Sequence, residues 1–312
     1  MSPAEGLDLL RALRPEALLL SAYDVWFSRR ESDRFRALSR DPALVETATV
    51  LDSGNYEAYR FDDRYSEKNP NGWSREKFHD VALFVEPDLA FAFDTIERTA
   101  SATEVIAKTV HSYEIDHRAL AARQFALCPI VHIPDRPNGE IASFAASIIK
   151  TVASEIDAPL IAVPERELGN GIGQRMRSVK AIRSALNELN HYYPLHILGT
   201  GNPLSVLALA AAGADGFDGL EWCRTVVDYE RGYLFHFQHF DFFAESQRFR
   251  VEHPLVRKLL DSPDSTYAMR TLSFNVDYFR SSTKTLQRMI AAGLERDLLN
   301  ELPGSGALLL KE

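Results

Sequence analysis

Three aspartates, Asp52, Asp94 and Asp218, lie at or just beyond short apolar stretches that have the composition of β-strands. Asp218 stands within the apolar sequence Gly-Phe-Asp-Gly-Leu, where an ionised carboxylate is costly unless it is paired or used in chemistry. Two carboxylates that converge on a sugar can act as a nucleophile and as a general acid/base. A third carboxylate, with His132 nearby, can read the hydrogen-bonding edge of a heterocyclic base. The residue types therefore predict chemistry at a glycosidic bond between a sugar and a base.

Each of these motifs alone is also typical of ordinary structure. Residues 52–54 (Asp-Ser-Gly) have the sequence of a turn, and Asp94 could cap a helix. A lone histidine such as His132 is commonly a core residue whose hydrogen bonds are satisfied. Residues 199–203 (Gly-Thr-Gly-Asn-Pro) suit a tight turn or a phosphate cradle, but they lack the glycine spacing of a dinucleotide fingerprint. Their joint occurrence after several strands is what favours a site.

The elements that must position these residues alternate along the chain. Eight apolar stretches predict strands at 17–25, 46–51, 89–93, 125–133, 159–163, 195–198, 216–220 and, in an aromatic stretch, 233–243. Apolar residues at helical spacing predict helices at 144–156, 176–189 and 204–212. This pattern favours an α/β fold, a (β/α)8 TIM barrel with a C-terminal helical extension, and a doubly wound open sheet is the alternative.

In such a barrel the side chains that do chemistry gather at the carboxyl ends of the strands. Besides the three aspartates and His132, we expect substrate contacts from the residues that follow the strands there: Ser53, Tyr56, Glu57, Glu165, Arg166, Gly199 and Gly201. The polar stretch 59–74 predicts a loop over these ends. No linker or repeat interrupts the chain, so residues 1–312 are expected to form a single domain, with 244–312 as terminal helices packed on the barrel.

Composition narrows the class of protein. The 312 residues carry a formal net charge of −9, which disfavours a protein that coats nucleic acid non-specifically but leaves room for local basic patches. The candidates for such contacts are Arg175, Arg177 and Arg224. Two cysteines cannot form a disulfide framework or a Cys-rich zinc site, so no metal or other cofactor is expected. No targeting signal or membrane-spanning run stands out, which predicts a cytoplasmic protein without membrane contact.

Taken together, these motifs resemble the tRNA-guanine transglycosylase (queuine/archaeosine tRNA-ribosyltransferase) family, including its DNA-modifying 7-deazaguanine branch. The stretch from Leu198 to Thr225 is similar to the Gly-x-Gly-x-Pro segment, helix and Gly-x-Asp-x-Phe-Asp segment of that family. The resemblance implies that Asp218 is the nucleophile and that Asp52 is the general acid/base. It also implies that Asp94 reads the base, and that His132 stands where the family often has a base-reading glutamine.

The sequence also departs from the pattern of that family. Glu57 replaces a glutamine, and residues 164–168 (Pro-Glu-Arg-Glu-Leu) replace a glycine-rich segment that borders the 7-position of the base. The zinc subdomain is missing, because no Cys-x-Cys-x-x-Cys motif follows the last predicted strand. In the family this subdomain supports tRNA binding and dimer contacts, so its absence shifts the expectation towards DNA or an atypical RNA. A homodimer, or a partner subunit in place of the zinc subdomain, is expected.

The resemblance implies a guanine transglycosylase that exchanges guanine in a nucleic acid for a 7-deazaguanine such as preQ0 or preQ1. A covalent glycosyl-aspartate would be the intermediate, and its partners would be DNA or RNA and a purine or 7-deazapurine base. Two alternatives stay open: a glycosidase or base exchanger that acts on free nucleosides or nucleotides, and a non-catalytic paralogue. Retention of all three aspartates argues against the latter.

Overall fold

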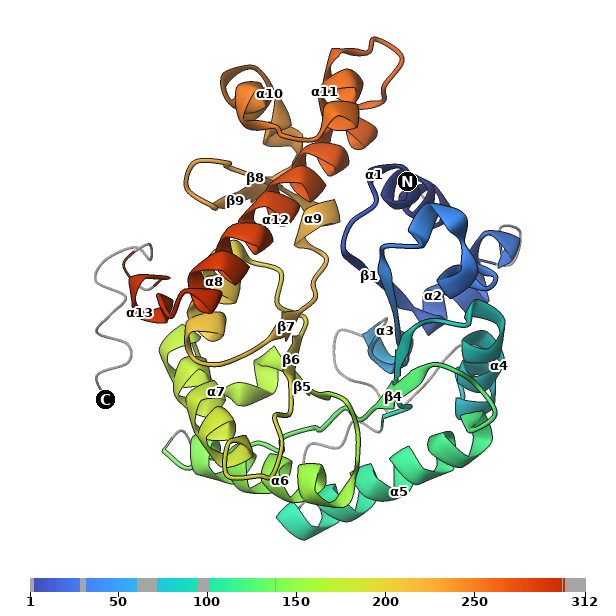
Figure 1. The fold of residues 1–312 in the computed structure, drawn as a ribbon, viewed down its shortest axis with the longest axis vertical. Coiled ribbons are helices and arrows are strands. Elements are labelled where there is room, and N and C mark those ends of the chain that lie inside the picture. The colour runs from blue at the N-terminus through green and yellow to red at the C-terminus, as the bar shows by residue number, and fades with distance from the viewer. Residues whose placement is uncertain are drawn as a thin grey trace.

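Short parallel strands form the centre of the molecule (Figure 1). The computed structural model describes residues 3–28, 32–60, 72–94, 101–137, 139–298 and 300. One parallel sheet contains β1 (Ala17–Ser21), β2 (Ala48–Asp52), β3 (Leu89–Phe91) and β4 (Ala126–Cys128), in that order. A second contains β5 (Ile161–Pro164), β6 (Leu195–Leu198) and β7 (Gly216–Phe217). A parallel bridge between Ile130 and Ala162 joins the sheets, so the strands succeed one another in chain order.

The joined sheets curve around an apolar interior. Phe91, Cys128, Ile130 and Ala162 form one buried cluster, against which side chains of the other strands pack, among them Leu19, Val50 and Leu198. The Phe91 ring on β3 also lies 5.3 Å, between centroids, from the His196 ring on β6. One face of β1 to β6 therefore points to a common centre. The described residues contain no ladder between β7 and β1, so a mixed α/β fold with parallel sheets is what the structure shows.

Helices surround the strands on the outside (Figure 1). They are α2 (Ala22–Phe27), α4 (Arg75–Val85), α5 (Ala102–Leu120), α6 (Ile141–Glu155), α7 (Ile172–Leu186) and α8 (Pro203–Ala211). The short α3 (Asn55–Arg60) follows the carboxyl end of β2. In α6 the buried residues Ile141, Ala145, Ile148 and Val152 recur at helical spacing and face the strands. The three predicted helices are confirmed as α6, α7 and α8, with shifts of one to four residues at their ends.

Four predicted strands differ from the structure by more than two residues. The stretch 125–133 is a strand only at Ala126–Cys128, and the stretch 216–220 only at Gly216–Phe217. The stretch 17–25 is a strand only to Ser21. The helix α2 begins at Ala22, and its apolar residues Ala22, Tyr23 and Val25 are buried. The aromatic stretch 233–243 is not an eighth parallel strand. Its first part is β9 (Leu234–His236), which pairs antiparallel with β8 (Thr225–Val227), and its last part begins α10 (Phe240–Gln247). The Phe240 ring packs inward against Tyr267 and Phe274, a contact that a helix provides.

The described part of the chain ends in helices, of which the first, α10, already begins at Phe240. The others are α11 (Pro254–Asp261), the long α12 (Tyr267–Ala291) and α13 (Glu295–Leu298), and the N-terminal α1 (Pro3–Leu13) packs against α11 and α12 (Figure 1). Asn275 of α12 accepts from the Val227 backbone N–H and donates to the carbonyls of Trp222 and Thr225. These bonds anchor the segment that follows Asp218, which includes α9 (Glu221–Arg224). Residues 61–71 of the predicted loop lie outside the described part.

Candidate functional site

The predicted aspartates and His132 lie at one edge of the parallel sheets. Asp52 is the last residue of β2, and Asp218 directly follows β7. Asp94 follows β3 by three residues, and His132 follows β4 by four. Because the strands are parallel, their carboxyl ends share an edge, which is where α/β proteins place their sites.

Asp94 and His132 are in direct contact within a buried cluster. His132 Nε2 lies 2.7 Å from Asp94 Oδ2, and the Ser53 hydroxyl donates to Asp94 Oδ1 at 2.6 Å. Asn55 adds a bond of 2.7 Å from its side-chain amide to the Asp94 carbonyl. The residue exposure of Asp94 is only 8%, yet both carboxylate oxygens have a donor. Burial acts to raise the pKa of Asp94, but the charge and hydrogen bond of His132 hold it below its usual value.

The other nitrogen of His132 is bound by a residue that the sequence did not point to. His132 Nδ1 lies 2.9 Å from Glu167 Oε1, and the Ile133 backbone N–H donates to Glu167 Oε2 at 2.9 Å. Burial acts to lower the pKa of His132, but the charges and hydrogen bonds of Glu167 and Asp94 raise it to about 10. His132 is therefore an imidazolium that donates to two carboxylates, and it holds Asp94 in place. The only signal for Glu167 was its position two residues after Glu165.

Asp218 is held by one oxygen only. His196 Nε2 lies 3.0 Å from Asp218 Oδ1, and the Gly199 N–H donates to the same oxygen at 3.2 Å. No described residue donates to Oδ2, and 21% of the side chain is exposed. A Cβ at Gly216 would lie 2.5 Å from His196 Nδ1, so that glycine leaves room for the imidazole. His196, a histidine within an apolar strand, was not predicted as a site residue.

Asp52 belongs to a turn that packs closely on the neighbouring strand. Its Oδ2 accepts from the Gly54 N–H at 3.0 Å, and Gly54 has a φ of +74°. A Cβ at Gly54 would overlap the backbone nitrogen of Tyr23, just after β1. The positive φ and the close approach of the backbone both require glycine here. The turn therefore fixes the positions of Asp52 and Ser53.

The glycine-rich segment after β6 packs closely against the carboxylate of Glu221. A Cβ at Gly201 or at Gly219 would overlap Glu221 Oε2, and the two glycines also lie against each other. That Glu221 oxygen is buried and has no hydrogen-bond partner among the described residues. Burial raises the pKa of Glu221, and the charges of Glu165 and Asp218 act in the same direction. Gly199 supplies its N–H to Asp218, whereas Gly201 makes space for Glu221.

The remaining predicted residues surround these groups. The Arg166 guanidinium lies 4.4 Å over the Tyr56 ring, which is 41% exposed, so segments after β2 and β5 meet there. Arg175 donates to Glu165 at 2.7 Å and to the Gly169 carbonyl at 3.0 Å. Arg175, a predicted nucleic-acid contact, therefore binds other groups of the protein in this structure. The side chain of Glu57 lies outside the described part of the structure.

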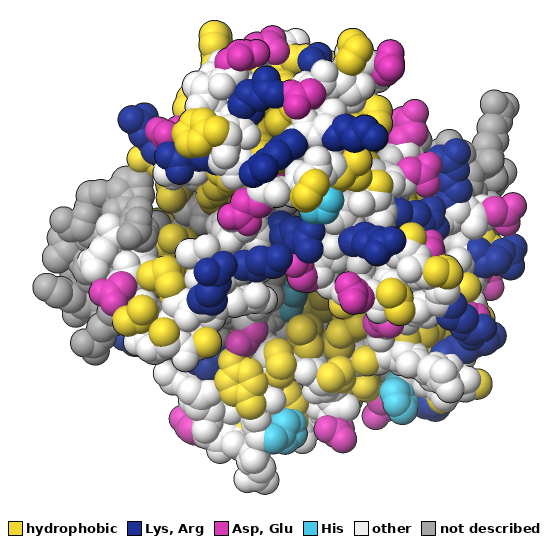
Figure 2. Space-filling view, turned by 45° about the horizontal axis from the view of Figure 1, so that its top comes forward, with side chains coloured by type: hydrophobic (Ala, Val, Ile, Leu, Met, Phe, Trp, Pro, Cys, Tyr) yellow, Lys and Arg dark blue, Asp and Glu magenta, His cyan; other side chains and the backbone are white. Residues whose placement is uncertain are grey.

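Two of the three predicted arginines face solvent. Arg177 borders an open concavity at the start of α7, together with Asn170 and Gln174, and Arg224 ends α9 close to Asp218. Figure 2 shows a hollow lined by hydrophobic side chains, with a histidine in its depth and a band of Lys and Arg side chains along one border. Acidic side chains also lie at its rim.

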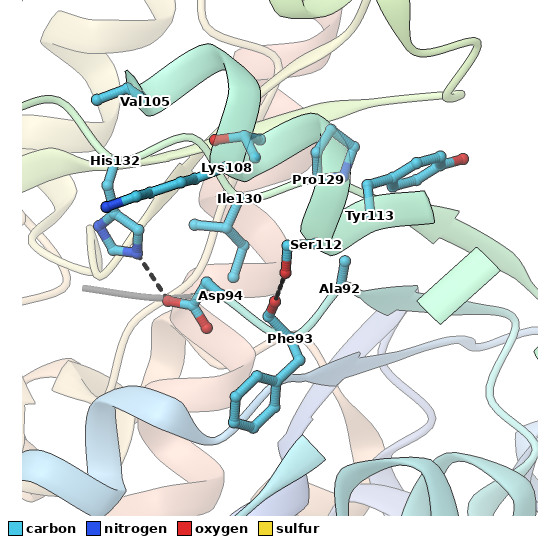
Figure 3. Close-up of a pocket in the computed structure, with 11 residues that line it drawn as sticks. Ala92, Phe93, Asp94, Val105, Lys108, Ser112, Tyr113, Pro129, Ile130 and His132 are labelled. Carbon is cyan, nitrogen blue, oxygen red and sulfur yellow. Dashed lines mark hydrogen bonds and ion pairs between the residues drawn. The ribbon is translucent and has the colours of Figure 1, made fainter. Parts of the chain in front are cut away.

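A small cavity lies behind Asp94 and His132, between α5 and the ends of β3 and β4 (Figure 3). Its volume is about 40 Å³, room for about three water molecules and not for a purine. Lys108 extends along it towards His132, and Ser112 points to the Phe93 carbonyl (Figure 3).

No family model matches the chain, and no curated protein matches it. The resemblance to the transglycosylases therefore depends on the motifs alone. In the part of the chain that the structure describes, no group of three or more His, Cys, Asp or Glu side chains could hold a metal ion. No described helix is long and apolar enough to span a membrane.

Proposed function

We propose that this protein is a guanine transglycosylase that acts on a nucleic acid through a covalent glycosyl-aspartate, on a strand arrangement that completes a (β/α)8 barrel. One observation carries this proposal. Asp218 is held through Oδ1 by His196 and Gly199, while Oδ2 has no donor among the described residues. A carboxylate that is oriented through one oxygen and open at the other suits nucleophilic attack.

The reaction would proceed by two displacements. Asp218 Oδ2 attacks C1′ of the nucleotide, the C1′–N9 bond breaks, and Asp52 delivers a proton to the departing guanine. The resulting bond between C1′ and Asp218 is then attacked by N9 of the incoming 7-deazaguanine, whose proton returns to the Asp52 carboxylate. Asp218 leaves as a carboxylate, and the two inversions give net retention at C1′.

Asp94 supports guanine as the base class. Its two oxygens each accept one hydrogen bond from the protein and keep lone pairs for further donors. Guanine and 7-deazaguanines carry neighbouring N1–H and N2–H donors, which match a carboxylate. His132 cannot accept from the base while both of its nitrogens donate to carboxylates, so its role in the proposal is to orient Asp94.

Exposed cations near the same edge support a nucleic-acid substrate. Arg177 lies on the first turns of α7, whose N-terminal end bears a partial positive charge, and Arg224 is six residues beyond Asp218. A band of basic side chains borders the hollow in Figure 2. Sugar-phosphate contacts there would place a nucleotide over Asp218.

The test is base exchange with labelled guanine, offered tRNA, duplex DNA or free guanosine. We expect label in a polynucleotide, and a covalent adduct that survives denaturation. Asp218→Asn should abolish both, because an amide cannot form the glycosyl ester. Asp215→Asn, three residues upstream at an exposed position paired with Arg183, is the matched control and should leave exchange intact. Normal exchange by Asp218→Asn would overturn the proposal.

A second candidate is base exchange or hydrolysis on free nucleosides. The net charge of −9 and the engagement of Arg175 by Glu165 favour it, since both weaken attraction to a polyanion. Label in free guanosine and in no polymer would establish this alternative.

A further inference from the structure

A buried aspartate on the outer side of the sheet accepts a hydrogen bond from the backbone of the residue before Asp94. Asp116 of α5 is fully buried, and its Oδ2 accepts from the Phe93 N–H at 2.7 Å. Its Oδ1 lies 2.5 Å from Arg75 Nη1 and 2.7 Å from His79 Nε2, both on α4. Asp116 was not among the predicted site residues.

The carbonyl of the same residue is held from the same helix. The Ser112 hydroxyl, one turn before Asp116, donates to the Phe93 carbonyl at 2.5 Å (Figure 3). Arg75 Nη2 in turn donates to the Ser112 oxygen at 2.6 Å, and its guanidinium lies 5.1 Å over the Phe93 ring. Both backbone groups of Phe93 are thus bound by side chains of α5.

These bonds occur where the strand ladder ends. The last pairing of β3 with β4 is Phe91 with Cys128, followed by one bond from the Ala92 N–H to the Cys128 carbonyl. Beyond that point α5 supplies the partners that neighbouring strands supply elsewhere. Asp94 follows Phe93 directly, and its carboxylate is bound by Ser53 and His132. Side chains of a functional site must be held within about 0.5 Å of their productive positions.

We propose that Asp116, Ser112 and Arg75 form a positioning cluster that sets the direction of the Asp94 carboxylate through the backbone of Phe93. This inference rests on the proposed function, in which Asp94 reads the base. None of the three side chains touches Asp94 itself in the contacts above, so their effect is transmitted by one peptide segment.

Two variants test the cluster. Asp116→Asn replaces one carboxylate oxygen of Asp116 by an amide group, which cannot accept a hydrogen bond. Ser112→Ala removes the hydroxyl that donates to the Phe93 carbonyl at 2.5 Å and leaves only the longer bond of 3.5 Å from Arg75 Nη2. We expect each to raise KM for the incoming base about tenfold, with a smaller change in the yield of the Asp218 adduct. Ser112→Thr keeps the hydroxyl, and its methyl group can enter the adjoining cavity, so it should restore the normal KM.

A readout independent of activity is the titration of His132, followed by NMR with 15N-labelled histidine. Its signal is assigned by its absence in His132→Gln. Loosening Asp94 should lower the titration midpoint of His132 by about one pH unit in Ser112→Ala and in Asp116→Asn. Asp277→Asn is the matched control: Asp277 is also buried and accepts backbone N–H bonds from Glu252 and His253, but it lies in the C-terminal helices.

The outcomes separate the two proposals. A lowered midpoint in both cluster variants, with no change in Asp277→Asn, supports positioning even if no exchange is detected. If Asp218→Asn abolishes exchange while the cluster variants keep the normal KM and midpoint, the positioning cluster is wrong and the function stands. Loss of thermal stability alone, equal in Asp116→Asn and Asp277→Asn, also overturns positioning.

Discussion

At the scale of single residues, one imidazolium between two carboxylates dominates the site. His132 donates to Asp94 and to Glu167, and each carboxylate is also held by a second donor, the Ser53 hydroxyl or the Ile133 N–H. A buried charge is tolerated only when it is paired and hydrogen-bonded, and this arrangement meets both conditions. It leaves Asp94 ionised and acceptor-only, which is what a base rich in donors requires.

The raised pKa of His132 predicts how stability depends on pH. The pKa is 6.5 in an ordinary environment and about 10 in the folded protein, so the native state holds an extra proton between these values. The stabilisation is complete below pH 6.5 and is lost as pH rises towards 10. Glu167→Gln should flatten this dependence, because one of the two carboxylates no longer attracts the imidazolium.

Urea denaturation at intervals between pH 6 and pH 10 measures this effect. The free energy of unfolding of the unmodified protein should decline over this range more steeply than that of Glu167→Gln. Glu188→Gln, at an exposed residue paired with Lys150, is the control and should follow the unmodified protein. Parallel curves for all three proteins would contradict the proposed charge state of His132.

At the scale of elements, the loops after the strands are built by backbone packing as much as by side chains. The Asp52-Ser53-Gly54 turn lies against the backbone after β1, and the glycines after β6 and β7 lie against each other and Glu221. Residues 199–203, which the sequence suggests as a turn or a phosphate-binding segment, serve in large part to let the backbone pack closely. Their glycines set how closely neighbouring strand ends approach.

This packing predicts a difference between two glycines that share a positive φ. Gly54 has φ +74° and a Cβ there would overlap Tyr23, whereas Gly293, with φ +71° after α12, has open space around it. Gly293→Ala should cost about 1 kcal/mol of stability, the strain of the left-handed backbone alone. Gly54→Ala should cost about 3 kcal/mol or more, because the Tyr23 segment must move as well.

Thermal or chemical unfolding of the two variants compares these costs. Gly54→Ala should also reduce base exchange, since Asp52 and Ser53 would move with the turn. Equal losses of stability in the two variants would show that the close contact with Tyr23 is relieved without strain.

At the scale of the whole molecule, charge is distributed unevenly. The net charge is −9, yet a band of basic side chains borders the hollow in Figure 2. A polyanion would therefore be attracted locally and repelled elsewhere, which favours binding at one place over coating. A homodimer, or a partner in place of a zinc subdomain, stays a prediction.

Local attraction predicts a salt dependence that specific arginines control. Replacing Arg177 and Arg224 together by alanine should weaken nucleic-acid binding and reduce the slope of log K against log salt by about 2, if each arginine neutralises one phosphate. Arg123→Ala is the control, because Arg123 is exposed just before β4, at the opposite edge of the sheet. Fluorescence anisotropy between 50 and 300 mM salt, which spans the range where such slopes are resolved, measures the slopes. A slope unchanged in the double variant would exclude these arginines as phosphate contacts.

The sequence by itself determined which residue types lie at the strand ends. Apolar stretches predicted where β1 to β7 lie, and apolar residues at helical spacing predicted α6, α7 and α8, because both patterns are local properties of the sequence. The aspartates at 52, 94 and 218 were therefore placed at one edge before any contact was known. The prediction of a strand at 233–243, made from its aromatic composition, was wrong for the second half of the stretch. There Phe240 begins a helix and packs against Phe274 of α12.

Only the tertiary structure decided which groups act together. Glu167 meets His132 across 35 residues, His196 meets Asp218 across 22, and Asp116 meets Phe93 across 23. Hydrogen bonds over such separations depend on how the strands and helices pack, and no local pattern encodes them. The physical reason is that a charge buried at one strand end is stabilised by whichever donors the fold brings to it, and those donors come from other elements.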